Sequence, residues 1–361
     1  MTEQKKPTDR LAFLDWMRGL GAFIMLQGHS FDSLLKPELR SSGAFVLSQF
    51  VGGIAPAIFL FLTGITFAFL MDSQSKQQPS SSKRVLRALH RSGYLFLLAF
   101  LFRLQLFAFG YPTSPAGELL KVDILNCMGL AMAIFAPMAV FTTRERIRLC
   151  GILGVLIAVL SPLVTMAGSG SLPWLAKAYF VPSYNCFGFF PWAAFLVFGM
   201  AAGSVLRAVG KEELQRIMQW AMLLGIVLVV GGQYFSNLPY SIYTKSEFWL
   251  DSPGLTIIKL GVLLTIGAIA YLWVTLSGSR WSLLRQLGRT SLLVYWVHIE
   301  LVYGRWFGPW KMQLVIVQVV VFAAVLVITM TGLSLLRTNW RNVRSFLSPT
   351  PIPAPDPASG D

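Results

Sequence analysis

The feature that most constrains this chain is a succession of apolar stretches, each about as long as a membrane is thick. A helix needs about 20 apolar residues to cross a hydrocarbon core of roughly 30 Å. We predict about ten such spans, over residues 11–35, 49–72, 85–107, 122–141, 149–167, 187–207, 217–235, 255–276, 290–304 and 312–336, the ninth being the shortest. The predicted fold class is therefore an all-α integral membrane protein, with a bundle of helices around a central cavity.

Composition and charge agree with a membrane protein. The 361 residues are 55% hydrophobic and only 13% charged, with a mean hydropathy of +0.62, which is too apolar for a soluble globular chain. The net charge of +14 comes from basic residues that recur in alternate connections between spans, as cytoplasmic loops require. We expect a lipid bilayer around the chain, both termini in the cytoplasm and no nucleic-acid partner.

The chain divides into one membrane domain and two short ends. Residues 1–10 form a charged segment predicted to be cytoplasmic, and residues 11–337 form the membrane domain, whose first span is too long and too polar for a cleaved signal. Residues 338–361 end in a Pro-rich stretch that we expect to be a disordered cytoplasmic tail. The three cysteines and three histidines show no metal-ligand spacing, so no metal site is predicted.

Small residues within the spans indicate close helix packing. Gly64 lies in one predicted span, and Gly199 and Gly203 lie in another. Such residues let neighbouring membrane helices approach each other closely. Because this packing can also join two copies of a chain, a homo-oligomer stays open.

The first span contains the stretch "RGLGAFIMLQGH", which begins at Arg18 and ends at His29. Eleven positions turn an α-helix by about 1,100° and raise it by about 16 Å, so these two side chains share one face. Asp15 and Asp32 each lie three positions away from one of them and can contact it. A stripe of four ionisable groups is costly in a membrane unless it faces a water-filled cavity or the bundle interior. The alternative is that Asp15 and Arg18 form an ion pair at the level of the lipid headgroups and that His29 is hydrogen-bonded inside the bundle.

These residue types indicate an acyl-transfer site. Arg18, towards the cytoplasmic mouth, suits a phosphate-bearing ligand such as acyl-CoA. His29 held by Asp32 is the arrangement expected of a general base, so we predict these two as catalytic residues. The same stripe also suits a transporter of a proton or small solute, although we find no inverted repeats.

Further polar residues extend the candidate site. Arg87 and Arg91 have helical spacing and suit the phosphates of the donor, or lipid headgroups. Asp123 and Asn126, in "DILNC", suit a sugar hydroxyl or amine, or the cap of a helix. His298, in the ninth span, is predicted either to line the cavity, as a second proton carrier or in substrate binding, or to be packed and hydrogen-bonded.

Five blocks, taken in order, resemble a known family. They are "RLAFLDWMRGLGAFIMLQGH", "GGIAPAIFLFLTGITFAF", "VDILNCMGLAMAIFAP", "FFPWAAFLVFGMAAG" and "LGRTSLLVYWVHI". Together they resemble the heparan-alpha-glucosaminide N-acetyltransferase catalytic-domain family in its compact bacterial form. The spacing from Arg18 to His29 is also similar to that of the related membrane acyltransferase-3 family.

The resemblance carries expectations about activity. It implies a multi-helix membrane acyltransferase that takes acetyl-CoA or another acyl-CoA as donor, with His29 as the catalytic residue, either as a base or as a nucleophile that carries the acyl group. The family's acceptor in animals is a terminal glucosamine amine, so we expect a sugar or glycan amine or hydroxyl outside the cytoplasm. A bacterial chain of this kind is expected in the cytoplasmic (inner) membrane.

Overall fold

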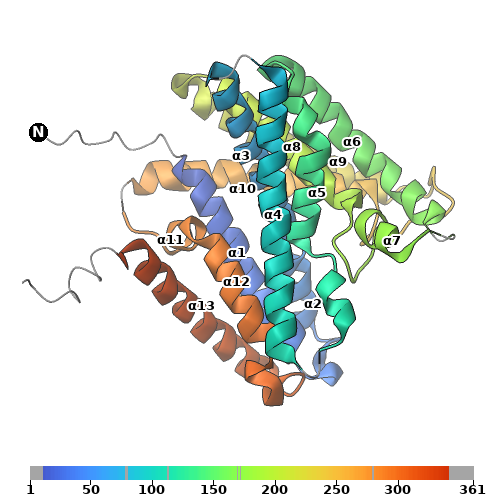
Figure 1. The fold of residues 1–361 in the computed structure, drawn as a ribbon, viewed down its shortest axis with the longest axis vertical. Helices are drawn as coiled ribbons and strands as arrows, with labels where there is room; N and C mark the ends of the chain where they lie inside the picture. Colours follow the sequence, from blue (N-terminus) through green and yellow to red (C-terminus); the bar gives the residue numbers. More distant parts are fainter. Residues whose placement is uncertain are drawn as a thin grey trace, which may run out of the picture.

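A computed structural model describes residues 11–77, 80–111, 114–168, 170, 172–278 and 280–340, which form a bundle of helices (Figure 1). The α-helices are α1 (Ala12–Leu34), α2 (Gly43–Gly52), α3 (Ala55–Gln77), α4 (Ser81–Gly110), α5 (Ile124–Phe135), α6 (Thr143–Ala167), α7 (Trp174–Phe180), α8 (Phe189–Ala208), α9 (Leu214–Ser236), α10 (Pro253–Ser277), α11 (Leu283–Arg289), α12 (Ser291–Tyr303) and α13 (Ile316–Thr338). Short 3-10 helices lie between them: η1 (Pro37–Leu39), η2 (Ala116–Leu120), η3 (Ala136–Ala139), η4 (Lys211–Glu213) and η5 (Arg305–Trp310). The N-terminal segment 1–10 and residues 341–361 of the expected disordered tail lie outside the described residues.

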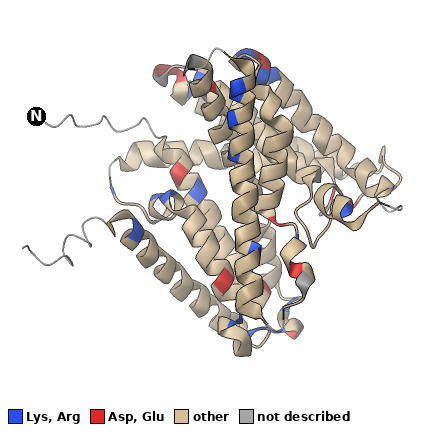
Figure 2. Ribbon diagram, viewed as in Figure 1, with Lys and Arg blue, Asp and Glu red and all other residues tan. Residues whose placement is uncertain are grey.

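Each predicted span coincides with a helical segment, but not all are equally apolar. In the described chain, 8 segments are long and apolar enough to cross a membrane: Gly43–Ser75, Ser81–Gly110, Gly117–Ala139, Thr143–Ala167, Phe189–Ala208, Leu214–Ser236, Pro253–Ser277 and Ile316–Thr338. The first predicted span, α1, has 23 residues but carries Asp15, Arg18 and Asp32. The ninth, α12, has 13 residues, about 20 Å of helix. Charged residues gather mainly at helix ends (Figure 2), as a multi-pass membrane bundle requires.

The second predicted span differs most from its expected limits. We expected residues 49–72, whereas the structure has two helices, α2 and α3, with a break at residues 53–54. The N–H of Gly53 bonds to the carbonyl of Gln49 at 2.9 Å and ends α2, and Pro56 lies in the first turn of α3. Proline is favoured there because the first helical N–H groups have no partner within the helix.

The predicted small-residue contacts are present between α3 and α8. A methyl group on Gly64 would overlap the carbonyl oxygen of Leu196, and one on Gly199 would overlap that of Phe61. Helix α8 thus packs backbone to backbone against α3, and its other side packs against α6. Helices α9 and α10 approach each other in the same way at Gly225 and Gly261.

A buried ion pair ties α3 and α6 together. Arg146, which is 1% exposed, pairs with the carboxylate of Asp72 and donates from Nε to the hydroxyl of Ser204, on α8, at 2.9 Å. Thr143 donates to the same carboxylate at 3.1 Å. Because buried charges are stable only when paired and hydrogen-bonded, this network fixes three helices relative to one another.

Helix α1 packs against α2, α3, α10, α11, α12 and α13, and it lies beside the C-terminal helices α11–α13 (Figure 1). Its contact with α11 is backbone to backbone, because methyl groups on Gly19 and Gly288 would overlap the carbonyl oxygens of Leu284 and Asp15. This approach brings the polar stripe of α1 next to the end of α11 and the beginning of α12.

The path from α11 to α12 is interrupted at Thr290, whose φ of −122° and ψ of 24° are not helical. The hydroxyl of Thr290 donates to Ser334 on α13 at 2.6 Å, and Ser334 donates to the carbonyl of Gln286 at 3.0 Å. Non-helical backbone within a membrane bundle is tolerated where its polar groups find such partners or line a cavity. Thr290 does both, because its hydroxyl has Ser334 as partner and the residue also lines a cavity.

Candidate active site

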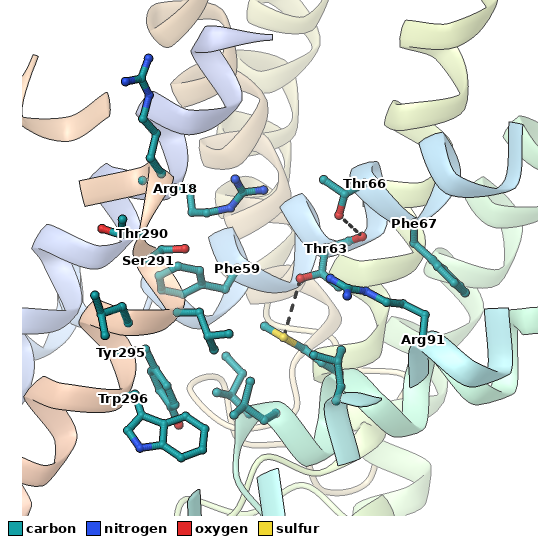
Figure 3. A pocket seen from close by; sticks show the side chains of 18 of the residues that line it. Arg18, Phe59, Thr63, Thr66, Phe67, Arg91, Thr290, Ser291, Tyr295 and Trp296 are labelled. Atoms are coloured by element: carbon teal, nitrogen blue, oxygen red, sulfur yellow. Dashed lines mark hydrogen bonds between the residues drawn. The ribbon is translucent and has the colours of Figure 1, made fainter. Parts of the chain in front are cut away.

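A cavity of about 930 Å³ lies between α1, α3, α4, α5 and the C-terminal helices α11, α12 and α13. Much of its wall is apolar, with Phe59 and Phe67 from α3 and Met128 from α5. The residues around Thr290 line it on another side, and Tyr295 and Trp296 lie together on the wall formed by α12 (Figure 3). The cavity is therefore assembled from helices far apart in the sequence.

Four arginine side chains line this cavity, one each from α1, α4, α11 and α13: Arg18, Arg91, Arg289 and Arg337. Arg91 extends towards Thr63 (Figure 3), and Arg18 is paired with Asp15 at 3.2 Å, as its spacing predicted. No Asp or Glu occurs among the lining residues in the described part of the chain. A cavity with this charge favours an anionic ligand, and guanidinium groups bind phosphate oxygens well.

The arginine positions agree only in part with the predicted donor-binding residues. Arg18 and Arg91 line the cavity, whereas Arg87 is not part of its lining. Arg289 and Arg337 were not predicted, because the basic stretches that contain them were interpreted as loop anchors. Their spacing alone carries no signal that distinguishes a cavity arginine from an anchoring one.

A pair of histidines joins α1 to α12. Nδ1 of His29 lies 3.0 Å from Nε2 of His298, and the two rings are nearly parallel, with centroids 5.2 Å apart. His298 is fully buried, and its Nδ1 lies 2.8 Å from the carbonyl oxygen of Val294. His29 is partly exposed. The sequence left two alternatives for His298. The structure shows the packed and hydrogen-bonded one, and the partner of His298 is His29.

The expected contact between Asp32 and His29 is not the one that forms. Within the described residues no hydrogen bond joins them; the Asp32 carboxylate accepts a bond of 2.8 Å from the hydroxyl of Tyr303. The ring of Tyr303 in turn packs edge-on against His29, with centroids 5.3 Å apart. Helical spacing allowed an Asp32–His29 contact, but Nδ1 of His29 faces His298 and the Asp32 carboxylate is bonded to Tyr303.

Tyr295 contacts both the cavity and the histidine pair. It lines the cavity, and its ring packs edge-on against His298 with centroids 5.9 Å apart. His29 itself is not among the lining residues. The arginine-lined cavity and the histidine pair therefore share Tyr295 as a common neighbour.

The other two predicted substrate-binding residues cap a helix. Asp123 accepts from the N–H groups of Leu125 at 3.0 Å and Asn126 at 3.2 Å, while Asn126 accepts from the N–H of Asp123 at 3.1 Å. The second carboxylate oxygen of Asp123 faces Arg103, on α4, at 3.2 Å. This is a capping box at the start of α5, one of the two alternatives that the sequence left open.

The fold and the site together define a class: a multi-pass helical membrane protein with a cationic cavity next to a hydrogen-bonded histidine pair. The model of an acyltransferase domain, that of the acyltransferase-3 family, matches residues 11–337, and the chain belongs to this family. This is the related family to which the Arg18–His29 spacing is similar. The match does not support membership in the heparan-alpha-glucosaminide N-acetyltransferase family. No curated protein matches the chain. Among the residues that the structure describes, no group of three or more His, Cys, Asp or Glu could hold a metal ion.

Proposed function

We propose that this protein transfers an acetyl or other acyl group from acyl-CoA to an amine or hydroxyl of a sugar or glycan. The observation that carries the proposal is the arginine-lined cavity beside the His29–His298 pair. Membership in the acyltransferase-3 family supports acyl transfer in general. Beyond acyl transfer in general, we propose the identity of the donor, the kind of acceptor and the roles of individual residues.

The cavity suits an acyl-CoA donor in charge and size. CoA carries three phosphate groups, and four arginines line the cavity, one of them already paired with Asp15. Its volume of about 930 Å³ lies within the usual range of ligand pockets, roughly 300–1,000 Å³. The apolar wall at Phe59, Leu125 and Met128 suits the less polar arm and acyl group of the donor.

His29 is the proposed general base. The acceptor's N–H or O–H proton passes to the imidazole as the acceptor atom bonds to the thioester carbonyl carbon. The C–S bond then breaks, and the leaving thiolate takes that proton from the imidazolium, so the products are the acylated acceptor and free CoA thiol. Asp32, with Tyr303 on its carboxylate, is proposed to stabilise the imidazolium through its negative charge.

The proposed arrangement in the membrane follows from the basic connections. The connections richest in Lys and Arg support an orientation with both termini in the cytoplasm and the Arg18 end of α1 on the donor side. The acceptor then approaches the His29 end of α1 from outside the cytoplasm. A sugar acceptor and a bacterial inner membrane are what the family resemblance implies, and Asp123 and Asn126 remain candidate acceptor residues at the start of α5.

Turnover of radiolabelled acetyl-CoA by the purified chain in liposomes tests the proposal, with amino sugars and glycans as acceptors. We expect labelled product from wild type and a loss of about 10²–10⁴-fold in His29→Gln, the usual contribution of a general base. His90→Gln is the matched control, because His90 is exposed on α4. Full activity in His29→Gln would overturn the role of His29, and a folded wild type that neither binds nor consumes acyl-CoA would overturn the proposed function.

One observation favours a second candidate function. The interruption between α11 and α12 lines the cavity, and interrupted helices of this kind are common at the binding sites of transporters. A transporter of a small solute or proton would use the same polar region. Flux through the same liposomes, with no acyl transfer, is the result that this alternative predicts.

A further inference from the structure

We infer that His298 is a positioning residue that fixes the tautomer of His29 and leaves Nε2 of His29 as the reactive nitrogen. The inference concerns the histidine pair itself, and only its catalytic consequence rests on the proposed function. In this role His298 acts on His29 and not on the substrate, because it determines which ring nitrogen of His29 keeps its lone pair.

The chain of hydrogen bonds begins at the backbone of α12. Nδ1 of His298 lies 2.8 Å from the carbonyl oxygen of Val294, one helical turn earlier. A carbonyl oxygen can only accept, so Nδ1 of His298 carries the hydrogen. His298 is fully buried, and within the described chain no carboxylate is bonded to it, which favours the uncharged ring. Its Nε2 then presents a lone pair and acts as an acceptor.

The contact between the two rings follows from that assignment. Nε2 of His298 lies 3.0 Å from Nδ1 of His29, and a hydrogen bond there requires a donor. Since His298 accepts, Nδ1 of His29 carries the hydrogen. A neutral imidazole has one N–H, so Nε2 of His29 is left with its lone pair. This atom makes no hydrogen bond within the described chain, and the ring to which it belongs is partly exposed.

The arrangement replaces a carboxylate partner by a histidine and a backbone carbonyl. A carboxylate bonded to Nδ1 of His29 would hold the ring in the same protonated form, but the carboxylate of Asp32 is bonded to Tyr303. When Nε2 of His29 takes a proton from the acceptor, the Nδ1–H bond to His298 stays in place. Hydrogen bonds in such a chain polarise one another, so the carbonyl of Val294 helps to stabilise the positive charge through His298.

Nitrogen NMR of the full chain in lipid, labelled with ¹⁵N-histidine, tests the inference without any substrate. The chain has only 3 histidines, so single substitutions assign every ring nitrogen. We expect His29 protonated at Nδ1 and unprotonated at Nε2, with a coupling through the hydrogen bond to Nε2 of His298. The coupling should vanish in His298→Gln and His29→Gln and persist in His90→Gln. A wild-type His29 protonated at Nε2, or no coupling between the two rings, would overturn the inference.

Turnover separates positioning from packing. His298→Gln keeps an acceptor oxygen for Nδ1–H of His29, whereas His298→Leu removes it and allows the other tautomer. We expect His298→Leu to lose about 10–100-fold in kcat with little change in KM, and His298→Gln to recover part of the loss. Equal activity in both variants would contradict the role. If His298→Leu does not fold, the nitrogen NMR spectrum of wild type decides whether His298 sets the tautomer of His29. If wild type shows the coupling but transfers no acyl group, the proposed function is wrong and the tautomer assignment stands.

Discussion

The hydroxyl of Tyr303, on α12, lies 2.8 Å from a carboxylate oxygen of Asp32, on α1, and the tyrosine ring packs against His29. Tyr303→Phe keeps the ring and removes the bond. Hydrogen bonds to charged groups contribute about 1.5–3 kcal/mol to stability. Because Asp32 is partly exposed, water can replace part of this bond, so we expect the free energy of unfolding to fall by about 1 kcal/mol. Thermal unfolding in detergent measures it.

The control for Tyr303→Phe is Tyr234→Phe, because Tyr234 is 64% exposed and its hydroxyl makes no hydrogen bond within the described chain. That variant should unfold like wild type. Equal unfolding temperatures for both variants would show that the Tyr303–Asp32 bond contributes nothing measurable.

The close contact of α1 with α11 predicts a steric effect. A methyl group on Gly19 would overlap the carbonyl oxygen of Leu284, and backbone cannot move aside as a flexible side chain can. We expect Gly19→Ala to destabilise the protein by about 1–3 kcal/mol, the usual cost of overpacking. Gly231→Ala on α9 is the control, since a methyl group there meets nothing within 4 Å. An unchanged unfolding temperature for Gly19→Ala would show that the two helices do not approach this closely.

The arginines that line the cavity predict a specific effect on donor binding. Arg289→Gln and Arg337→Gln each remove one cation from the cavity wall without a large change in size. We expect the KM for acyl-CoA to rise about tenfold for each, equivalent to about 1.4 kcal/mol. Arg87→Gln, on the exposed surface outside the cavity, should leave the KM unchanged. If all three variants respond alike, general charge attraction explains the binding and a phosphate site in the cavity does not.

The buried ion pair between Arg146 and Asp72 predicts a large loss of stability. Arg146→Met leaves the carboxylate buried without its cation, and breaking a buried pair in this way costs about 3–5 kcal/mol. Arg148→Met, two positions along α6 and exposed, should cost little. Thermal unfolding compares the two. A double variant, Arg146→Met with Asp72→Leu, should recover part of the loss; if it is as unstable as the single variant, the pair is not what joins the helices.

Local patterns in the sequence were sufficient for the class of fold and for contacts within one helix. The length of each apolar stretch predicted the helices, because the thickness of a bilayer is a fixed physical requirement. The three-residue spacing of Asp15 and Arg18 predicted their ion pair, because helix geometry alone brings them together. The same geometry allowed Asp123 and Asn126 to form a capping box without the rest of the bundle.

Only the tertiary structure decided the partners of the site residues. Spacing placed Asp32 within reach of His29, but the hydrogen-bond partner of His29 in the structure is His298, 269 positions away. Arg289 and Arg337 line the cavity because α11 and α13 pack beside α1, which no local pattern records. The sequence by itself determined a membrane helical bundle with an ionisable stripe on its first helix. A helix satisfies its own backbone, but His29 and Asp32 find their hydrogen-bond partners on another helix, so those partners depend on contacts between distant parts of the chain.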